Sequence, residues 1–282
     1  MLRLEDRCIS NRRVDCTELR RRGPPEGRTM LTLENLSQRA FAAFDEAVAQ
    51  VPGAVVTPSV PILFFGDLRR YHCSPVRIVT VGLNPSLAEF PPARPLARFP
   101  AATGLSGLHS PPDHDGYITA LSNYFRVEPY RSWFATYDGL LEGLDASFYD
   151  EYPNTALHTD ICSPVATNPT WSLLPQPARA ALIQPGRALW HDLIRLLRPH
   201  VLLISVARQH LDTIDFAEDS EWAELHRVER PNPYIVRHRR LRLGDGTTTA
   251  LVFGQAAQKP FGLVGKADKR RIGASVKVLL GV

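Results

Sequence analysis

A polar turn after a run of β-branched residues holds the first side chain that could do chemistry. The turn is Gly82-Leu83-Asn84-Pro85-Ser86, and it follows Arg77–Val81. Gly82 lets the backbone turn sharply and approach a ligand, and Pro85 biases Asn84 towards an extended conformation. An amide held rigidly in this way can orient a water molecule or stabilise a developing positive charge. The same residues also suit a plain Asn-Pro turn that closes a strand.

A second polar segment, His158-Thr159-Asp160-Ile161-Cys162-Ser163-Pro164, also follows an apolar run. An aspartate that leaves a strand beside Asn84 could read the edge of a nucleic-acid base, because its carboxylate accepts hydrogen bonds from ring N–H groups. The alternative is an aspartate at a strand end that caps the next turn.

The third segment runs from Phe253 to Leu263 and leads into a cluster of cations. Small residues, amides and cations in a loop suit contacts with backbone phosphates. Phe261 or Leu263 could wedge into a stack of bases. The residues predicted to contact DNA are Ser86, Gln258, Lys259, Phe261, Lys266 and Arg270. The alternative is a solvated basic helix near the C-terminus.

Alternating strands and helices must position these segments. Thr32–Gln50 has helical apolar spacing with Thr32 as its cap, and Tyr117–Phe125 is also helical. Pro185 is predicted in the first turn of a helix that carries an apolar stripe from Leu189 to Leu197. The predicted strands are Arg77–Gly82, Ala156–Ile161, Val201–Val206, Arg239–Leu243 and Thr248–Phe253, the last two joined by a tight turn at Gly244-Asp245-Gly246.

The alternation predicts an α/β fold of three layers, α/β/α, with a short and mainly parallel central sheet of four strands. In such sheets ligands bind beyond the carboxyl ends of the strands. We therefore expect the segments after Gly82, Asp160 and Phe253 to converge.

The composition is that of a globular protein with a core, with 44% hydrophobic and 22% charged residues among 282. The net charge of +4 and the pI of about 9.0 favour polyanionic partners without proving them. No C-x2-C pair occurs among Cys8, Cys16, Cys73 and Cys162. We expect no metal, since this spacing argues against an iron–sulfur cluster or a structural zinc. Scattered thiols, no secretory signal and no run long enough to span a membrane predict a cytoplasmic protein.

Residues 1–30 differ from the rest, because they combine many arginines with little apolar periodicity. The arginines are Arg3, Arg7, Arg12, Arg13, Arg20, Arg21, Arg22 and Arg28. This extension is either a solvated, flexible tail, including one upstream of a true start at Met30, or a basic arm that touches phosphates. Residues 31–282 are expected to form a single domain.

The order of the three segments resembles the uracil-DNA glycosylase superfamily. Gly82-Leu83-Asn84-Pro85 is similar to the G-x-N-P start of the mismatch-specific and single-strand-selective branches. His158-Thr159-Asp160-Ile161-Cys162 resembles the strand that carries the family's uracil-reading amide. The helix that ends at Arg198-Pro199-His200, with the strand after it, is also similar, and the match spans roughly Arg77 to Gly273.

The chain departs from the family's pattern at two places. Gly254-Gln255-Ala256-Ala257 stands where the family usually has His-Pro-Ser, whose histidine supports the leaving uracil. Asp160 stands where the family has an asparagine. These departures favour either a divergent active branch or a relative whose catalytic power is redistributed or lost.

The resemblance implies a repair enzyme that flips uracil out of DNA and hydrolyses its N-glycosidic bond, leaving an abasic site and free uracil. It implies a monomer that needs no cofactor. The implied catalytic residues are Asn84, which positions the water, and Gln255. Gln255 or nearby backbone amides would supply the donors in place of the missing histidine, and His109 is a weaker candidate. The implied uracil-binding residues are Gly82, Leu83, Phe99 and Asp160, with Phe90 as the alternative stacking ring.

Two other functions stay open. A DNA-binding module that kept the fold and lost the chemistry would fit the missing histidine and would bind DNA with strong salt dependence. A hydrolase of free nucleosides is the other, although the basic segment from Gln258 to Arg271 argues against a small substrate.

Overall fold

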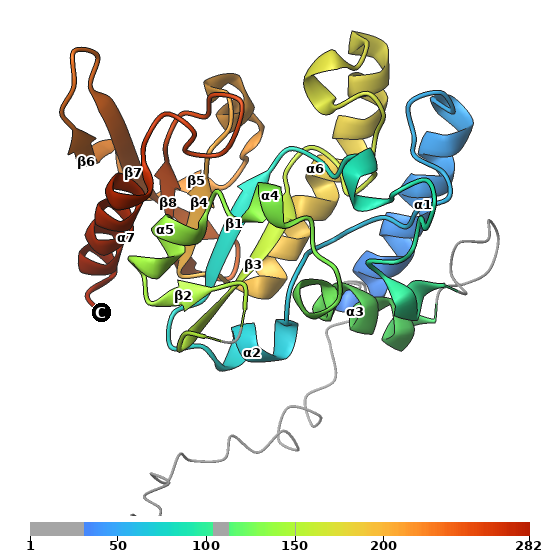
Figure 1. The fold of residues 1–282 in the computed structure, drawn as a ribbon, viewed down its shortest axis with the longest axis horizontal. Helices are drawn as coiled ribbons and strands as arrows, with labels where there is room; N and C mark the ends of the chain where they lie inside the picture. Colours follow the sequence, from blue (N-terminus) through green and yellow to red (C-terminus); the bar gives the residue numbers. More distant parts are fainter. Residues whose placement is uncertain (1–30, 104–112, 150) are drawn as a thin grey trace, which may run out of the picture. The chain divides into compact units, whose positions relative to one another are not determined.

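The computed structural model describes residues 31–103, 113–149 and 151–282. From Thr32 onward the chain forms one compact unit. Within these residues a single sheet has eight strands, in the order β2-β3-β1-β4-β8-β7-β5, with β6 also paired to β7 (Figure 1). The predictions for residues 1–30 and for His109 lie outside the described residues.

Five neighbouring strands of this sheet run parallel. They are β2 (Ala146–Ser147), β3 (Asn154–Asp160), β1 (Ile78–Gly82), β4 (Val201–Ile204) and β8 (Thr247–Phe253). Every residue of β1, β3 and β4 is buried, as expected for short apolar strands covered on both faces. The predicted strands at these positions are therefore confirmed, within one or two residues at their ends.

The other strands extend the sheet in the antiparallel sense. They are β7 (Tyr234–Leu243), which forms the predicted hairpin with β8, and the two strands that pair with β7, namely β5 (Ala217–Glu218) and β6 (Ala223–Val228). The predicted count of four strands was wrong. Both β5 and β6 are largely exposed, and β2 has only two residues, so none of them shows the apolar signal of a core strand.

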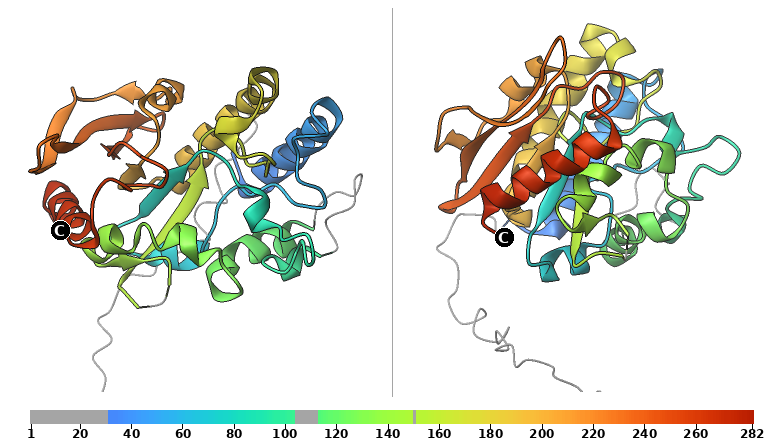
Figure 2. Two further views of the ribbon diagram at one scale, coloured as in Figure 1. Left: turned by 45° about the horizontal axis from the view of Figure 1, so that its top comes forward. Right: turned by 60° about the vertical axis from the view of Figure 1, so that its left-hand side comes forward.

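Helices lie on both faces of the sheet, which confirms the α/β class. Figure 2 shows α1 (Leu33–Gln50) beside α6 (Gln176–Leu197) on one face, and α5 (Asp138–Glu142) beside α7 (Lys266–Leu280) on the other. The shorter helices are α2 (Leu68–Cys73), α3 (His114–Ser122) and α4 (Arg131–Phe134). Thr32 caps α1 as predicted, since its side chain accepts a hydrogen bond from the backbone N–H of Asn35.

The prediction for Pro185 was wrong, because this proline lies inside α6 and the first turn holds Pro177 instead. An internal proline removes one helical hydrogen bond. The next residue, Gly186, packs so tightly that an added Cβ would lie 2.2 Å from the carbonyl oxygen of Cys162. The burial of the α6 stripe against the sheet, which includes Leu189 and Leu193, offsets the cost of the proline.

None of the helices in the described residues combines the length and the apolar character needed to cross a bilayer.

Candidate functional site

The carboxyl ends of the central strands lie at one edge of the sheet, as predicted. In the register Gly82 lies beside Asp160, and Ile204 beside Phe253. Backbone hydrogen bonds continue past the strand ends, because the N–H of Cys162 donates to the carbonyl of Leu83 at 2.9 Å. The first two polar segments are therefore direct neighbours. The third polar segment follows β8, and β4 lies between β8 and β1 in the sheet.

Gly82 makes room for two buried polar side chains of β3. A Cβ added at Gly82 would lie 2.5 Å from Oδ1 of Asp160 and 3.0 Å from Nε2 of His158. His158 and Asp160 are two residues apart on one strand and so share a face, with Nε2 and Oδ1 separated by 3.7 Å. His158 Nδ1 is hydrogen-bonded to Oγ1 of Thr80 at 2.8 Å. The strand ends thus hold a fixed imidazole beside a carboxyl group.

The side chain of Asn84 is fixed by hydrogen bonds that its amide nitrogen donates. Its Nδ2 donates to the carbonyl of Pro85 at 2.7 Å, to that of Val165 at 3.3 Å and to Oγ1 of Thr167 at 2.9 Å. No hydrogen bond from the described residues reaches its Oδ1. The side chain is half-buried, so this oxygen can accept a hydrogen bond from a water or a ligand.

Ser86 has a local structural role. Its Oγ accepts a hydrogen bond from the N–H of Ala88 and caps the short 3₁₀ helix Leu87–Glu89. Ser86 also forms a β-bridge with Thr167. Its predicted contact with DNA stays a prediction.

Phe99 and its alternative, Phe90, lie in a buried aromatic cluster. The Phe99 ring stacks on Phe90 and on Tyr124, with centroids 5.4 Å apart in both pairs. Phe99 is completely buried. Because its ring already has two stacked neighbours, a flipped base could use this ring only after a neighbour shifts.

Glu89, which the sequence did not single out, is buried beside these rings. The hydroxyl of Tyr124 donates to its Oε2 at 2.5 Å, and Nη1 of Arg98 lies 3.7 Å from the same oxygen. Burial raises the pKa of Glu89 to about 7. The hydrogen bond from Tyr124 and the charge of Arg98 lower this pKa, whereas the negative charge of Asp160 raises it. Glu89 therefore holds its proton up to near neutral pH and lies within electrostatic reach of Asp160.

Tyr137 completes what we call the polar cluster, made up of Glu89, Arg98, Tyr124, Tyr137, His158 and Asp160. The Tyr137 ring lies 5.9 Å from that of His158, and burial followed by the charge of Asp160 raises the pKa of its hydroxyl. Within the described part of the chain, this hydroxyl and both Nε and Nη1 of Arg98 are buried without a hydrogen-bond partner. Buried donors are normally paired, so the Tyr137 hydroxyl has unused hydrogen-bonding capacity, whereas Nη1 of Arg98 still faces Oε2 of Glu89 at 3.7 Å.

The sequence could have indicated His158, because residues two apart on a strand point to the same face and His158 is two residues from Asp160. Glu89 had no comparable signal in the sequence, since it is a lone acid between apolar neighbours in a loop. Its position depends on the fold of the loop, which brings Arg98 and Tyr124 against it.

The third segment is only partly placed as predicted. Gln255 is exposed, and the contact described for it is made by its backbone carbonyl, which accepts a hydrogen bond from the Tyr234 hydroxyl at 2.8 Å. Gln258 and Lys259 are exposed and so are accessible to a partner.

Phe261 is completely buried, which makes it a poor wedge residue. Its ring packs over Gly254, where an added Cβ would lie 2.5 Å from Cε1, and its N–H donates to Oγ of Ser205 at 2.7 Å. A ring held in this way cannot enter a base stack unless the turn unfolds. Of the two predicted wedge residues, only Leu263, with 40% of its surface exposed, is accessible.

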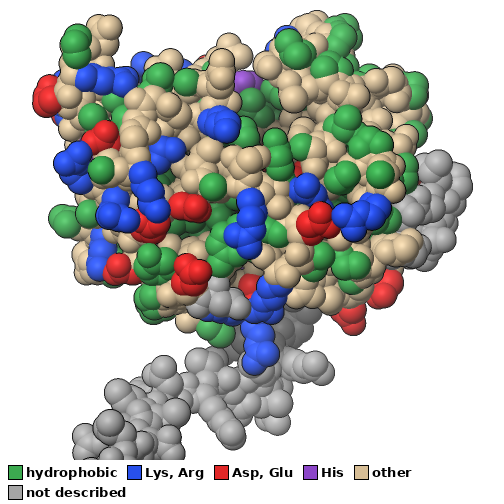
Figure 3. Space-filling model, in the orientation of Figure 1, with side chains coloured by type: hydrophobic (Ala, Val, Ile, Leu, Met, Phe, Trp, Pro, Cys, Tyr) green, Lys and Arg blue, Asp and Glu red, His purple; other side chains and the backbone are tan. Residues whose placement is uncertain are grey.

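Lys266 and Arg270 at the start of α7 are exposed, but both are ion-paired with Glu142 of α5. Figure 3 shows positive and negative side chains interspersed over the part of the surface that carries α5 and α7. A phosphate bound there would compete with Glu142, which weakens the predicted role of these two residues.

The described residues contain no cluster of His, Cys, Asp and Glu that could hold a metal ion. No protein-family model, curated protein or solved structure matches this chain.

Proposed function

We propose that this chain is a DNA-repair glycosylase that hydrolyses the N-glycosidic bond of uracil in DNA, as a divergent relative of the uracil-DNA glycosylases. The observation that supports the proposal is the pairing of Gly82 with Asp160, which brings the G-L-N-P turn beside the segment expected to read the base. Both lie at the carboxyl ends of adjacent parallel strands, where α/β sheets bind ligands.

In this proposal the target nucleotide flips out of the DNA and its base enters between the two turns. Asp160 reads N–H groups on the base edge, and Oδ1 of Asn84 accepts a hydrogen bond from the attacking water. As the C1′–N bond breaks, its electron pair stays on the base. The water oxygen bonds to C1′, and one water proton ends on the base, so that an abasic site and free uracil form without a cofactor.

The departing base needs donors where negative charge develops, because preorganised donors are worth several kcal/mol there. The family's histidine is missing, and the side chain of Gln255 is exposed. Burial, and then the charge of Asp160, raises the pKa of the Tyr137 hydroxyl, which therefore keeps its proton at neutral pH. Burial raises the pKa of Glu89 to about 7, also with a contribution from Asp160, so a substantial fraction of Glu89 is protonated at neutral pH. We assign them the donor role in place of the histidine.

The test uses an end-labelled oligonucleotide with one uracil, followed by alkali, which cleaves the strand at an abasic site. The wild type should release uracil, and Asn84→Ala should lower the rate by about 100-fold or more while the protein stays folded. Asn35→Ala on α1 is the matched control and should leave the rate unchanged. Equal rates for Asn84→Ala and the wild type would remove Asn84 from the chemistry.

A catalytically inactive DNA-binding relative is the second candidate, favoured by the two rings stacked on Phe99 and by the exposed Gln255. Salt-dependent binding of DNA by the wild type without release of uracil would identify it.

A further inference from the structure

Many arginines and lysines of the described residues form ion pairs, and a few do not. Lys266 and Arg270, for example, are both paired with Glu142. The side chains that form no hydrogen bond, ion pair or cation–π contact with another described residue are Arg69, Arg179, Arg208, Arg237, Arg240 and Lys259. An unpaired cation can bind an anion without first giving up an acidic partner.

Arg179, Arg208 and Lys259 lie at the carboxyl edge of the sheet, and we call these three side chains the cationic rim. Arg179 is in the first turn of α6, and because α6 leads directly into β4, this turn lies at the far end of β4 (Figure 1). Arg208 begins the 3₁₀ turn that follows β4, and Lys259 lies in the segment that follows β8. The last two segments are adjacent, since the N–H of Phe261 donates to Oγ of Ser205 at 2.7 Å.

Two interactions connect the cationic rim to the candidate site. Cys162, two residues beyond Asp160, has its Sγ 3.8 Å from Nδ1 of His210. His210 belongs to the same 3₁₀ turn as Arg208, and its pKa is lowered by burial and then by the positive charge of Arg179. Arg179 and Arg208 therefore lie near the segment that carries Asp160.

Two of the three segments that carry the cationic rim contain no acidic residue. Residues 161–191, which include Arg179, and residues 246–267, which include Lys259, have no Asp or Glu. Asp212 shares the 3₁₀ turn with Arg208 but forms no ion pair with it. The three cations of the rim therefore outweigh Asp212, and the excess positive charge can attract a polyanion.

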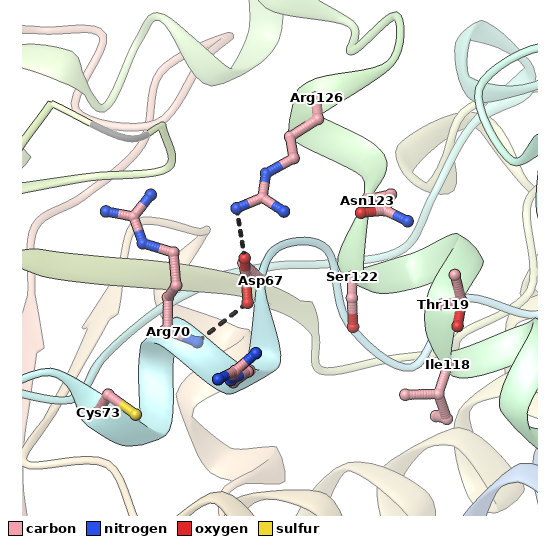
Figure 4. A pocket seen from close by; sticks show the side chains of 9 residues that line it. Asp67, Arg70, Cys73, Ile118, Thr119, Ser122, Asn123 and Arg126 are labelled. Carbon is pink, nitrogen blue, oxygen red and sulfur yellow. Dashed lines mark hydrogen bonds and ion pairs between the residues drawn. The ribbon is translucent and has the colours of Figure 1, made fainter.

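The polar cavity of about 510 Å³ between α2 and α3 offers no comparable group of cations. Oδ2 of Asp67 pairs there with Nη2 of Arg126 at 2.7 Å, and its Oδ1 accepts a hydrogen bond from the N–H of Arg70 at 2.9 Å (Figure 4). Neither Arg70 nor Arg126 is free, so Arg69 is the one unpaired cation among the described residues that line this cavity. The cationic rim is thus a feature of the carboxyl edge.

We propose that the sugar–phosphate backbone of a DNA strand crosses the carboxyl edge of the sheet with its phosphates at Arg179, Arg208 and Lys259. The inference rests on the proposed function for the identity of the polyanion. Phosphate contacts are independent of base sequence and fix the position of the strand. At the cationic rim they hold the strand beside the turns that would receive the flipped base.

The test measures binding and not excision. A fluorescein-labelled DNA duplex without uracil is titrated with the full-length protein, and anisotropy gives the association constant K between about 50 and 200 mM salt. Arg179→Gln, Arg208→Gln and Lys259→Gln should each reduce the steepness of log K against log salt by about 1, because each removes one phosphate contact. Each should also weaken binding about tenfold at roughly 0.1 M salt.

Arg240→Gln is the matched control. Arg240 is exposed and forms no ion pair with another described residue, but it lies opposite Ala250, which is level with the first residue of β4. This substitution should leave the salt dependence unchanged. The proposal is overturned if the rim variants keep the salt dependence of the wild type, if Arg240→Gln lowers it as much, or if the wild type does not bind the duplex at about 50 mM salt.

The proposed glycosylase activity has a separate outcome. Rim variants with a reduced salt dependence, in a protein that releases no uracil, would support this surface and contradict the glycosylase activity. Release of uracil by a protein whose rim variants bind DNA as the wild type does would contradict the surface alone.

Discussion

Replacing Glu89 by glutamine should change how the stability of the protein depends on pH. Burial raises the pKa of Glu89 from an ordinary 4.5 to about 7 in the folded chain. Below about pH 4.5 the carboxyl group is protonated in both the folded and the unfolded chain. Between pH 4.5 and 7 only the unfolded chain gives up the proton, so the wild type loses stability as the pH rises.

The size of the effect follows from the shift. Each pH unit in this window lowers the free energy of unfolding by about 1.4 kcal/mol, which gives about 3 kcal/mol over the whole window. Glutamine cannot ionise, and its carbonyl can still accept the hydrogen bond from Tyr124. The stability of Glu89→Gln relative to the wild type should therefore rise by about 3 kcal/mol from pH 4.5 to 7 and stay constant above about pH 8.

The assay is urea unfolding of the wild type and Glu89→Gln at several pH values, with the free energy of unfolding extrapolated to water. Glu221→Gln is the control, because Glu221 is exposed and makes no ion pair with another described residue. Its difference from the wild type should change little with pH. A constant difference between Glu89→Gln and the wild type from pH 4.5 to 8 would refute the reasoning, and so would a difference of the opposite sign.

Three further substitutions test the arrangement of the site. Asp160→Asn should keep or improve uracil excision if Asp160 only reads the base, whereas complete loss of excision would show that its carboxyl group takes part in the chemistry. Gly82→Ala should cost about 1–3 kcal/mol of stability, because the added Cβ would lie 2.5 Å from Oδ1 of Asp160; Gly53→Ala, with nothing within 4 Å, is the control in urea unfolding. Phe261→Ala should cost about 3–5 kcal/mol, whereas Leu263→Ala should change stability by less than about 0.5 kcal/mol and should slow excision if Leu263 is the wedge. Similar stability losses for Phe261→Ala and Leu263→Ala would contradict the burial difference.

The central strands could be predicted because their apolar, β-branched runs are short and bounded by polar turns. β1, β3 and β4 have no exposed residue, so their sequences carry the signal of a buried parallel strand. The exposed strands β5 and β6 carry no such signal, since their pairing with β7 depends on the hairpin that β7 forms with β8. Local pattern therefore predicted the centre of the sheet and missed its antiparallel extension.

Some residues of the candidate site could likewise be predicted from local sequence, and others could not. Asn84 and Asp160 could be placed from sequence, because each follows a predicted strand and parallel strands end at a common edge. Glu89 could not, because its pKa is raised by burial, and that burial depends on how distant parts of the chain pack around it. Tyr124 and Arg98, which the fold brings against Glu89, oppose this rise. The burial of Phe261 was also hidden, since it depends on the close approach of its ring to Gly254.

Two glycines at the carboxyl edge explain why polar and aromatic groups can crowd together there. At Gly82 a side chain would displace the carboxyl group of Asp160, and at Gly254 it would displace the ring of Phe261. The Phe261 ring in turn lies 6.4 Å from the ring of Tyr137, whose hydroxyl has no hydrogen-bond partner among the described residues. The third segment therefore contributes to this site through the packing behind Tyr137. In the proposed glycosylase reaction, the segment would act through this packing and not through the exposed side chain of Gln255.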